Sequence, residues 1–406
     1  MLDFEDALGR LLAGAHAVRE TETVPTQAVA GRVLAQGLRS TIDVPPLDNT
    51  SMDGYALRCA DIPASGTRLA VAQRIPAGSV GHVLAPGTAA RIFTGAPLPA
   101  GADAVVMQEL CAIDGGTVTV NHVPHMGEWI RRRGEDIAAG SEVLAAGTRL
   151  TAAHVGVAAS VGAAQLTVFR RLRVALFSTG DELAMPGEPL KPGGIYNSNR
   201  YTLRALLEGL GCEVADLGIV PDSREATRAA LRLAAAGNDL ILTSGGVSVG
   251  EEDHVKPAVE AEGALDLWKI AIKPGKPLAF GNVRRGVGAG NTATETAAFI
   301  GLPGNPVSSF VTFLMLVRPF ILKAQGASIV APRAQQMRAD FDCKGDPRRE
   351  FLRARINAEG GLELFPNQSS GVLTSCTWAD GLIDNPPRQA IARGNMVRFL
   401  PFGELL

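Results

Sequence analysis

The stretch DLILTSGGVSVGEEDHVKPA, residues 239–258, decides the fold class of the chain. An apolar run with the character of a buried strand leads into a glycine-rich loop, which carries three consecutive acids before a helical segment begins. Strand-like and helix-like segments go on alternating from about residue 172 to 325. This alternation predicts a mostly parallel sheet with helices on both faces, which is a three-layer α/β domain over residues 172–326.

Capping signals predict where the helices of this domain begin. Ser198 is expected to cap a helix that ends at Gly211. Asp222 and the glutamate three residues later have the spacing of a capping box for the next helix. Asn305 followed by Pro306 is a strong start signal, because proline is favoured at the first helical position.

Four loops are expected to meet at one edge of this sheet, since ligands of open α/β sheets bind outside the carboxyl ends of the strands. Gly245 and Gly246 let backbone amides approach a phosphate. The neighbouring acids would repel a bare phosphate, so a Mg²⁺ ion between them is expected, with Asp253 and Glu182 as candidate ligands. The four loops each follow an apolar run and have the sequences STGDE, TSGGVSVGEED, KPGKP and LPGNP.

Lysines near the same edge suit an oxyanion. Lys273 and Lys276 lie on the KPGKP loop (residues 273–277), which two prolines stiffen, and Lys269 lies one strand length upstream. A structural interpretation stays open for each loop, because Asp253 is also a plausible helix cap and a Lys-Pro pair is an ordinary solvated turn.

The rest of the chain has different patterns. Short β-like runs between Gly/Pro turns predict a small β domain over residues 46–139. The flanking Ala/Leu-rich segments, 1–45 and 140–171, predict a helical domain into which the β domain is inserted. After residue 327 the pattern is β again, with a hairpin and a last strand, MVRFLPF. The expected fold class is therefore α/β plus β, in a multidomain chain.

The composition of the 406 residues, with 46% hydrophobic and 20% charged, is that of a soluble globular protein. A formal net charge of −2 argues against nucleic acid as a partner. No membrane association is expected, because the apolar run from Val307 is interrupted by Arg318 and Pro319. The five scattered cysteines and the acidic N-terminus favour a cytoplasmic protein with reduced thiols. Walker A, dinucleotide-binding and serine-hydrolase motifs do not occur in the sequence.

Eight motifs in order resemble the molybdopterin molybdenumtransferase (MoeA) family, which is similar also to the C-terminal domain of gephyrin. The resemblance covers nearly the whole chain. It implies an elongated homodimer and, over residues 327–406, a C-terminal β barrel. It also implies that adenylylated molybdopterin reacts with the substrate molybdate in the presence of Mg²⁺, so that AMP leaves and the dithiolene takes up molybdenum. The motifs are PPLDNTSMDGYALR, RIFTGAPLPAGADAVVMQE, RRRGEDI, STGDEL, YNSNRYTL, TSGGVSVGEEDHVK, IKPGKP and GLPGNPVSSFVTF.

Site residues follow from the resemblance together with the loop chemistry above. The expected catalytic residues are Asp53, Asp136, Asp222, Lys269 and Lys273. Those expected to bind substrate are Thr94, Glu182, Gly245, Gly246, Ser248, Lys276, Pro303 and Pro306, and those expected to bind the metal are Asp253 and Glu182.

The distribution of these residues along the chain implies a shared site. Asp53 and Asp136 belong to the predicted β domain, which the resemblance places over the cleft of the partner subunit. The chain departs from the family at the glycine-rich excursion 284–296 and at Glu251-Glu252, where an Asp-Tyr-type pair is common. Two other functions stay open: the related molybdopterin adenylyltransferase step, whose enzyme is also a candidate protein partner, and a non-enzymatic scaffold like gephyrin.

Overall fold

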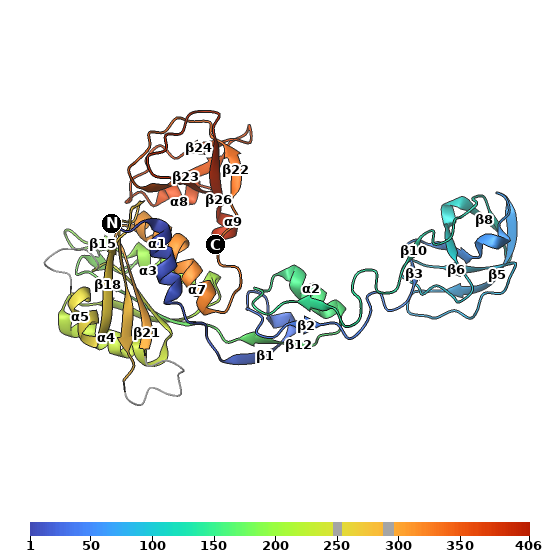
Figure 1. Cartoon of the computed structure of the whole chain (residues 1–406), viewed down its shortest axis with the longest axis horizontal. Coiled ribbons are helices and arrows are strands. Elements are labelled where there is room, and N and C mark those ends of the chain that lie inside the picture. The colour runs from blue at the N-terminus through green and yellow to red at the C-terminus, as the bar shows by residue number, and fades with distance from the viewer. Residues whose placement is uncertain (247–253, 287–295) are drawn as a thin grey trace.

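The computed structural model of the chain describes residues 1–246, 254–286 and 296–406. The molecule is elongated (Figure 1): an α/β domain and a C-terminal sheet lie at one end, a small β domain lies at the other end, and a narrow segment joins them. This agrees with the multidomain α/β plus β class that the sequence predicts. Ser248 and Asp253, and most of the excursion 284–296, lie outside the described residues.

The α/β domain has a six-stranded sheet in the order β16-β13-β17-β21-β20-β18. The four strands from β16 to β21 pair in parallel, and β20 is antiparallel to both of its neighbours. The predicted mostly parallel sheet is thus confirmed. Its strands are β13 (Arg173–Thr179), β16 (Glu213–Val220), β17 (Leu240–Ser244), β18 (Gly263–Lys269), β20 (Pro277–Arg284) and β21 (Thr296–Leu302).

Helices cover both faces of this sheet and make the predicted three layers. Apolar residues of α4 and α5 pack with Phe177 and Ile241 on one face. Residues of α1, α3, α6 and α7 pack with Leu176 and Leu242 on the other face. Successive side chains of a strand point to opposite faces of the sheet. Neighbouring residues of β13 and of β17 therefore pack against helices on opposite faces. The helices are α1 (Phe4–Ala13), α3 (Ser198–Gly209), α4 (Arg224–Gly237), α5 (Val255–Glu262), α6 (Pro306–Thr312) and α7 (Arg318–Ala324).

Two predicted helix caps are wrong by one residue. The side chain of Asn197, not Ser198, accepts the amide of Arg200 at the start of α3. Ser223, not Asp222, caps α4 through the amide of Ala226. Both α3 and α4 still begin where the pattern predicts, and Asn305 with Pro306 opens α6 as expected. The shift matters for Asp222, because it places this residue one position before the N-cap, so that its carboxylate is not used as the helix cap.

The apolar run from Pro306 to Ala324 is one continuous helix, in which α6 and α7 are joined by a π-helical turn at Phe313–Val317. Pro319 lies directly after this turn, at the start of α7, where proline is tolerated. Among the described residues this is the helix long and apolar enough to cross a membrane, yet 94% of its apolar window is buried inside the protein. Its apolar character therefore reflects its position in the core of the α/β domain.

The segment predicted to be helical, 1–45 and 140–171, is mixed instead. Helix α1 packs into the α/β core through Phe4, Ala7 and Leu11. The remainder forms a small core of its own around Leu34 and Val168. The prediction of a helical domain is wrong because the apolar residues of α1 pack into the α/β domain and not into a helical core of the N-terminal segment. The remaining elements are α2 (Ala152–Ser160) and the antiparallel pairs β1 (Thr21–Pro25) with β12 (Gln165–Phe169) and β2 (Leu38–Arg39) with β11 (Glu142–Leu144).

The far end of the molecule is a six-stranded sheet in the order β7-β4-β6-β5-β9-β8. The chain enters and leaves this end beside the antiparallel bridge between Val44 and Ile137. Its strands are β4 (Gly54–Leu57), β5 (Thr67–Ile75), β6 (Thr88–Ile92), β7 (Ala104–Met107), β8 (Cys111–Asp114) and β9 (Thr117–Val120), with a separate pair β3 (Asn49–Thr50) and β10 (Ile130–Arg131).

The C-terminal sheet has the order β19-β23-β25-β26-β22, and β24 also pairs with β23. A single bridge between Ala339 and Leu362 links the end of β22 to β24. Only this bridge joins β22 to β24 in the described residues, whereas the other neighbouring strands of the sheet pair through ladders. The closed barrel therefore stays a prediction. The elements are β19 (Ile272–Lys273), β22 (Gln335–Arg338), β23 (Arg349–Ile356), β24 (Leu362–Leu364), α8 (Thr374–Trp378), β25 (Gly381–Asn385), β26 (Met396–Pro401) and α9 (Phe402–Leu405).

Candidate functional site

A cleft of about 1120 Å³ lies at the edge of the α/β sheet where the parallel strands end, and we call it the carboxyl-edge cleft. All four loops that the sequence places at this edge line it. They follow β13, β17, β18 and β21. Strand β18 runs in the same direction as the parallel strands, because β20 is antiparallel to both β18 and β21. The geometry therefore agrees with the expectation that ligands bind beyond the carboxyl ends of the strands.

The cleft brings together eight of the predicted site residues. Lys269 ends β18 at the same edge but is absent from the lining, and its backbone oxygen accepts the amide of Leu2. Ser248 and Asp253 lie outside the described residues. The eight that line the cleft are Glu182, Asp222, Gly245, Gly246, Lys273, Lys276, Pro303 and Pro306.

Gly245 and Gly246 occupy backbone conformations that other residues rarely adopt, with φ of 92° and 64°. A Cβ atom on Gly245 would lie 2.9 Å from the carbonyl oxygen of Thr179, and one on Gly246 would lie 2.5 Å from a methyl carbon of Val255. Both positions therefore require glycine, because a side chain there would strain the backbone and clash with Thr179 or Val255.

Asn199 holds two of the loops together. Its side-chain amide donates to the Ser244 hydroxyl at 3.1 Å and to the Gly304 carbonyl at 2.8 Å. Loops after β17 and β21 are thereby fixed relative to each other before any ligand arrives. The YNSNRYTL motif contains this residue, but the sequence gives no sign that its role is to join the loops.

Carboxylates enter the cleft from the loop after β13 and from one further loop, after β16. Glu182 precedes the two-residue strand β14 (Leu183–Ala184), which pairs with β15 (Ile195–Tyr196). Asp222 follows β16, and its amide lies 3.4 Å from the Asp181 carboxylate. The described residues contain no cluster of three or more His, Cys, Asp or Glu side chains suited to a metal. Two carboxylates still fit Mg²⁺, which takes one or two of them together with phosphate oxygens and waters.

Lys273 is held by two acids of the C-terminal part of the chain. Its Nζ lies 3.1 Å from Asp346 and 3.0 Å from Glu350, whose side chain is only 3% exposed. Burial alone would lower the pKa of Lys273, but the hydrogen bonds to these two acids outweigh it and raise the pKa. Lys273 therefore links the α/β domain to the C-terminal part of the chain through ion pairs, and it also places a positive charge in the cleft.

The sequence missed the contribution of the C-terminal segment to the cleft. Arg348 and the loop 368–371 line it, and Arg348 pairs with Asp346 at 3.0 Å. Behind the loop, the fully buried Arg353 donates to the Ser369 carbonyl at 3.3 Å and to the Ser375 hydroxyl at 3.1 Å. A serine-rich stretch after a hairpin is common in loops, so only the tertiary contact identifies it as part of a site.

The predicted residues of the β domain form a separate group. The Asp53 carboxylate accepts the Thr94 amide at 2.8 Å and the Thr94 hydroxyl at 2.7 Å, and these bonds lower its pKa. Asp136 is exposed beside the bridge at which the chain leaves the β domain. Figure 1 shows this domain at the opposite end of the molecule from the α/β sheet. Asp53, Thr94 and Asp136 therefore do not meet the cleft of their own chain.

Comparison with known proteins identifies the family of the chain. Family models for the MoeA N-terminal region (domain I and II), a probable molybdopterin binding domain and the MoeA C-terminal region (domain IV) match residues 2–162, 175–323 and 336–402. A molybdopterin molybdenumtransferase from Haemophilus influenzae is 44% identical over 328 residues, which cover 80% of this chain and 78% of that protein. One from a Nostoc species is 36% identical over 394 residues, which cover 95% and 86%.

Solved structures extend the similarity to the whole architecture. The molybdopterin biosynthesis MoeA protein from Pyrococcus horikoshii OT3 superposes with a TM-score of 0.81 at 27% identity, covering 99% of this chain and 100% of that one. A second MoeA structure from the same species gives a TM-score of 0.75 at 31% identity, covering 99% of both chains. Fold, motif order and identity over most of the length agree, and the chain belongs to the MoeA family of molybdopterin molybdenumtransferases.

Proposed function

We propose that the carboxyl-edge cleft inserts molybdenum from molybdate into adenylylated molybdopterin, with Mg²⁺-dependent release of AMP. The chain is a transferase of molybdenum cofactor biosynthesis by its family. The observation that carries the assignment of the reaction to this cleft is the convergence of two glycines, two carboxylates and three basic side chains, Lys273, Lys276 and Arg348, on one lining.

Each group has a role that its chemistry supports. Gly245 and Gly246 line the cleft, and backbone amides of such a glycine turn can donate to a phosphate. Lys276 and Arg348 neutralise the charge of the phosphates or of molybdate. Glu182 and Asp222, with Asp253, would hold Mg²⁺, which supplies charge neutralisation on the phosphates when bound. Pro303 and Pro306 fix the backbone of the loop between β21 and α6.

The site is completed by a second subunit in this proposal. Asp53, Thr94 and Asp136 lie too far from the cleft of their own chain, as the elongated shape in Figure 1 supports. A two-fold dimer would place the β domain of each chain at the cleft of the other and create two equivalent sites. Closure of the C-terminal sheet into a barrel belongs to the same proposal.

The test is release of AMP from adenylylated molybdopterin by the purified protein. We expect release only when both Mg²⁺ and molybdate are present, and the product should activate a molybdenum enzyme that lacks its cofactor. Equal AMP release after chelation of the metal would contradict the proposed mechanism.

A further inference from the structure

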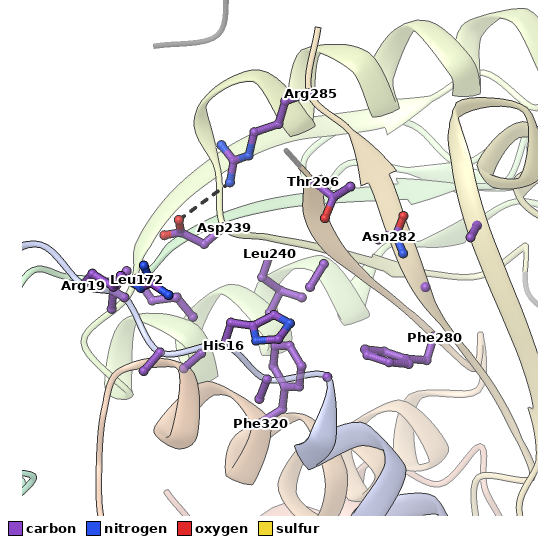
Figure 2. Close-up of a pocket in the computed structure, with 18 of the residues that line it drawn as sticks. His16, Arg19, Leu172, Asp239, Leu240, Phe280, Asn282, Arg285, Thr296 and Phe320 are labelled. Atoms are coloured by element: carbon purple, nitrogen blue, oxygen red, sulfur yellow. Dashed lines mark ion pairs between the residues drawn. The ribbon is translucent and has the colours of Figure 1, made fainter. Parts of the chain in front are cut away.

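A second cavity, of about 1020 Å³, lies at the opposite edge of the same sheet, where the parallel strands begin, and we call it the amino-edge cavity. Its lining includes the first residues of β17 and β21, the segment 14–20 between α1 and β1, and the end of α7. Figure 2 shows Arg285 turned toward Asp239 at one end and Phe280 and Phe320 at the other. None of the residues assigned to molybdenum insertion lines it.

The polar end contains a buried arginine, Arg285, whose ion pair with Asp239 is long. The Arg285 side chain is only 5% exposed, and its nearest carboxylate oxygen, on Asp239, is 3.8 Å away. Its buried Nε–H has no hydrogen-bond partner. Burial accordingly lowers the pKa of Arg285 from its ordinary value. An arginine normally satisfies its donors when buried, so this position calls for an acceptor.

Asp239 does not reach hydrogen-bond distance of Arg285, and three other donors hold its carboxylate where it is. Arg170 donates two hydrogen bonds to its carboxylate at 2.7 and 2.9 Å, and the Arg173 amide donates a third at 2.9 Å. The remaining acids of the lining, Glu20 and Asp266, are exposed, and Glu20 lies 3.4 Å from Arg170. Within the described part of the chain, Arg285 is therefore paired less closely than Arg170, and its Nε–H is left without an acceptor.

The other end of the cavity is aromatic and apolar. The rings of Phe280 and Phe320 lie edge to face with their centroids 6.0 Å apart, and Leu172, Leu240 and Ala298 complete the wall. Pockets for small molecules have this composition, with mostly apolar walls and a few convergent polar groups that orient the ligand. A planar guanidinium at the end of such a pocket matches two oxygens of a carboxylate or phosphate.

We propose that the amino-edge cavity binds a small molecule that joins an oxyanion to a flat apolar body, with the oxyanion on Arg285 and the body on Phe280 and Phe320. This site is distinct from the site of molybdenum insertion and lies at the other edge of the sheet. The ligand supplies the hydrogen-bond acceptor that the Nε–H of Arg285 lacks, and the apolar walls exclude water from this contact, which strengthens it.

The proposal is tested with 2-naphthoate, 2-naphthyl phosphate and neutral 2-naphthamide, titrated into the full chain by calorimetry. We expect both anions to bind, and the tighter of the two identifies the preferred oxyanion. Arg285→Gln should weaken anion binding by roughly 10-fold or more, as for loss of a charged hydrogen bond, and leave naphthamide binding unchanged. Arg284→Gln is the matched control, because Arg284 is exposed and donates to the Ala261 carbonyl.

A second variant tests the cavity without touching its charge. Ala298→Leu adds volume to the wall and should abolish binding of all three probes, while AMP release in the carboxyl-edge cleft continues. Lys276→Ala, which removes a charge of that cleft, should leave naphthoate binding intact. Failure of both anions to bind the wild-type chain at millimolar concentration, or equal affinity for wild type and Arg285→Gln, would overturn the proposal.

Discussion

The carboxyl-edge cleft and the amino-edge cavity are similar in volume, about 1120 and 1020 Å³, and lie at opposite edges of one sheet, yet they are built in different ways. The cleft is made mainly of loops that directly follow strands, with glycines and prolines that mark them in the sequence. The cavity is made of strand beginnings, a helix end and a linker that only tertiary packing brings together. A site built from strand-following loops can be found from the sequence, and the other kind cannot.

The largest expected effect separates the two regions by activity. Asp222→Asn should lower the rate of AMP release by about 100- to 1000-fold, as for loss of one electrostatic group in an active site. Asp266→Asn, in the amino-edge cavity, should leave the rate unchanged. Steady-state rates of both variants with saturating molybdate are the measurement. Similar rates for the two variants would remove the distinction between the cleft and the cavity.

The two lysines of the KPGKP loop should differ in stability. Lys273→Ala leaves the buried Glu350 without its cation, so the free energy of unfolding should fall by roughly 1–3 kcal/mol. Lys276→Ala should weaken molybdate use without this loss, since Lys276 makes no ion pair within the described part of the chain. Chemical denaturation of both variants measures the difference. Equal stability of the two variants would mean that the ion pairs of Lys273 with Asp346 and Glu350 do not stabilise the fold.

A glycine-to-alanine change should destabilise the protein at the cleft wall, where the backbone has a positive φ, but not in an exposed helix. Gly246→Ala places a Cβ atom 2.5 Å from Val255 at a positive φ, so we expect it to cost about 1–3 kcal/mol and to reduce turnover. Gly9→Ala is the control, because Gly9 lies in helix α1 with open space around it, and alanine there should stabilise by roughly 0.5–1 kcal/mol. Thermal unfolding of the two variants should move in opposite directions. A Gly246→Ala chain as stable and active as wild type would show that the wall tolerates a side chain.

The smallest expected effect concerns pH. The pKa of Asp346 is lowered, mainly by Arg348 and also by Lys273, so its contribution to stability is lost only as pH falls through that lowered value. The pKa of Lys273 is raised, so its contribution is present below the ordinary lysine value and is lost as pH rises through the raised one. The stability difference between wild type and Lys273→Ala should thus stay constant from about pH 5 to 9 and shrink only above about pH 10.4. A difference that changes within the neutral range would contradict the assigned pairing.

Sequence and structure agree where local chemistry decides the outcome. Asn305 with Pro306 begins a helix because both residues prefer those positions, and Gly245 and Gly246 mark an open turn for the same kind of reason. The caps at Asn197 and Ser223 were missed because adjacent polar residues can all cap, and only the backbone path selects one. The choice between neighbours is a tertiary effect.

Long-range packing explains the remaining differences. Helix α1 was assigned to the N-terminal segment, but its apolar face fits the α/β core across more than 150 residues of chain. Arg348, the loop 368–371 and Arg285 were missed for the same reason, because nothing in their neighbourhoods along the chain shows what they face. The resemblance to the MoeA family predicts a role for residues such as Asp53 and Asp136, which no local pattern assigns.

The central claim is that each cleft is completed by the β domain of a partner subunit, and subunit mixing tests it most directly. Asp136→Asn and Asp222→Asn should each be nearly inactive alone. A mixed dimer would carry both changes at one site and neither at the other, so each heterodimer should recover about half of the wild-type AMP release. Activity no greater than the sum of the separate variants, under conditions shown to exchange subunits, would contradict the shared cleft.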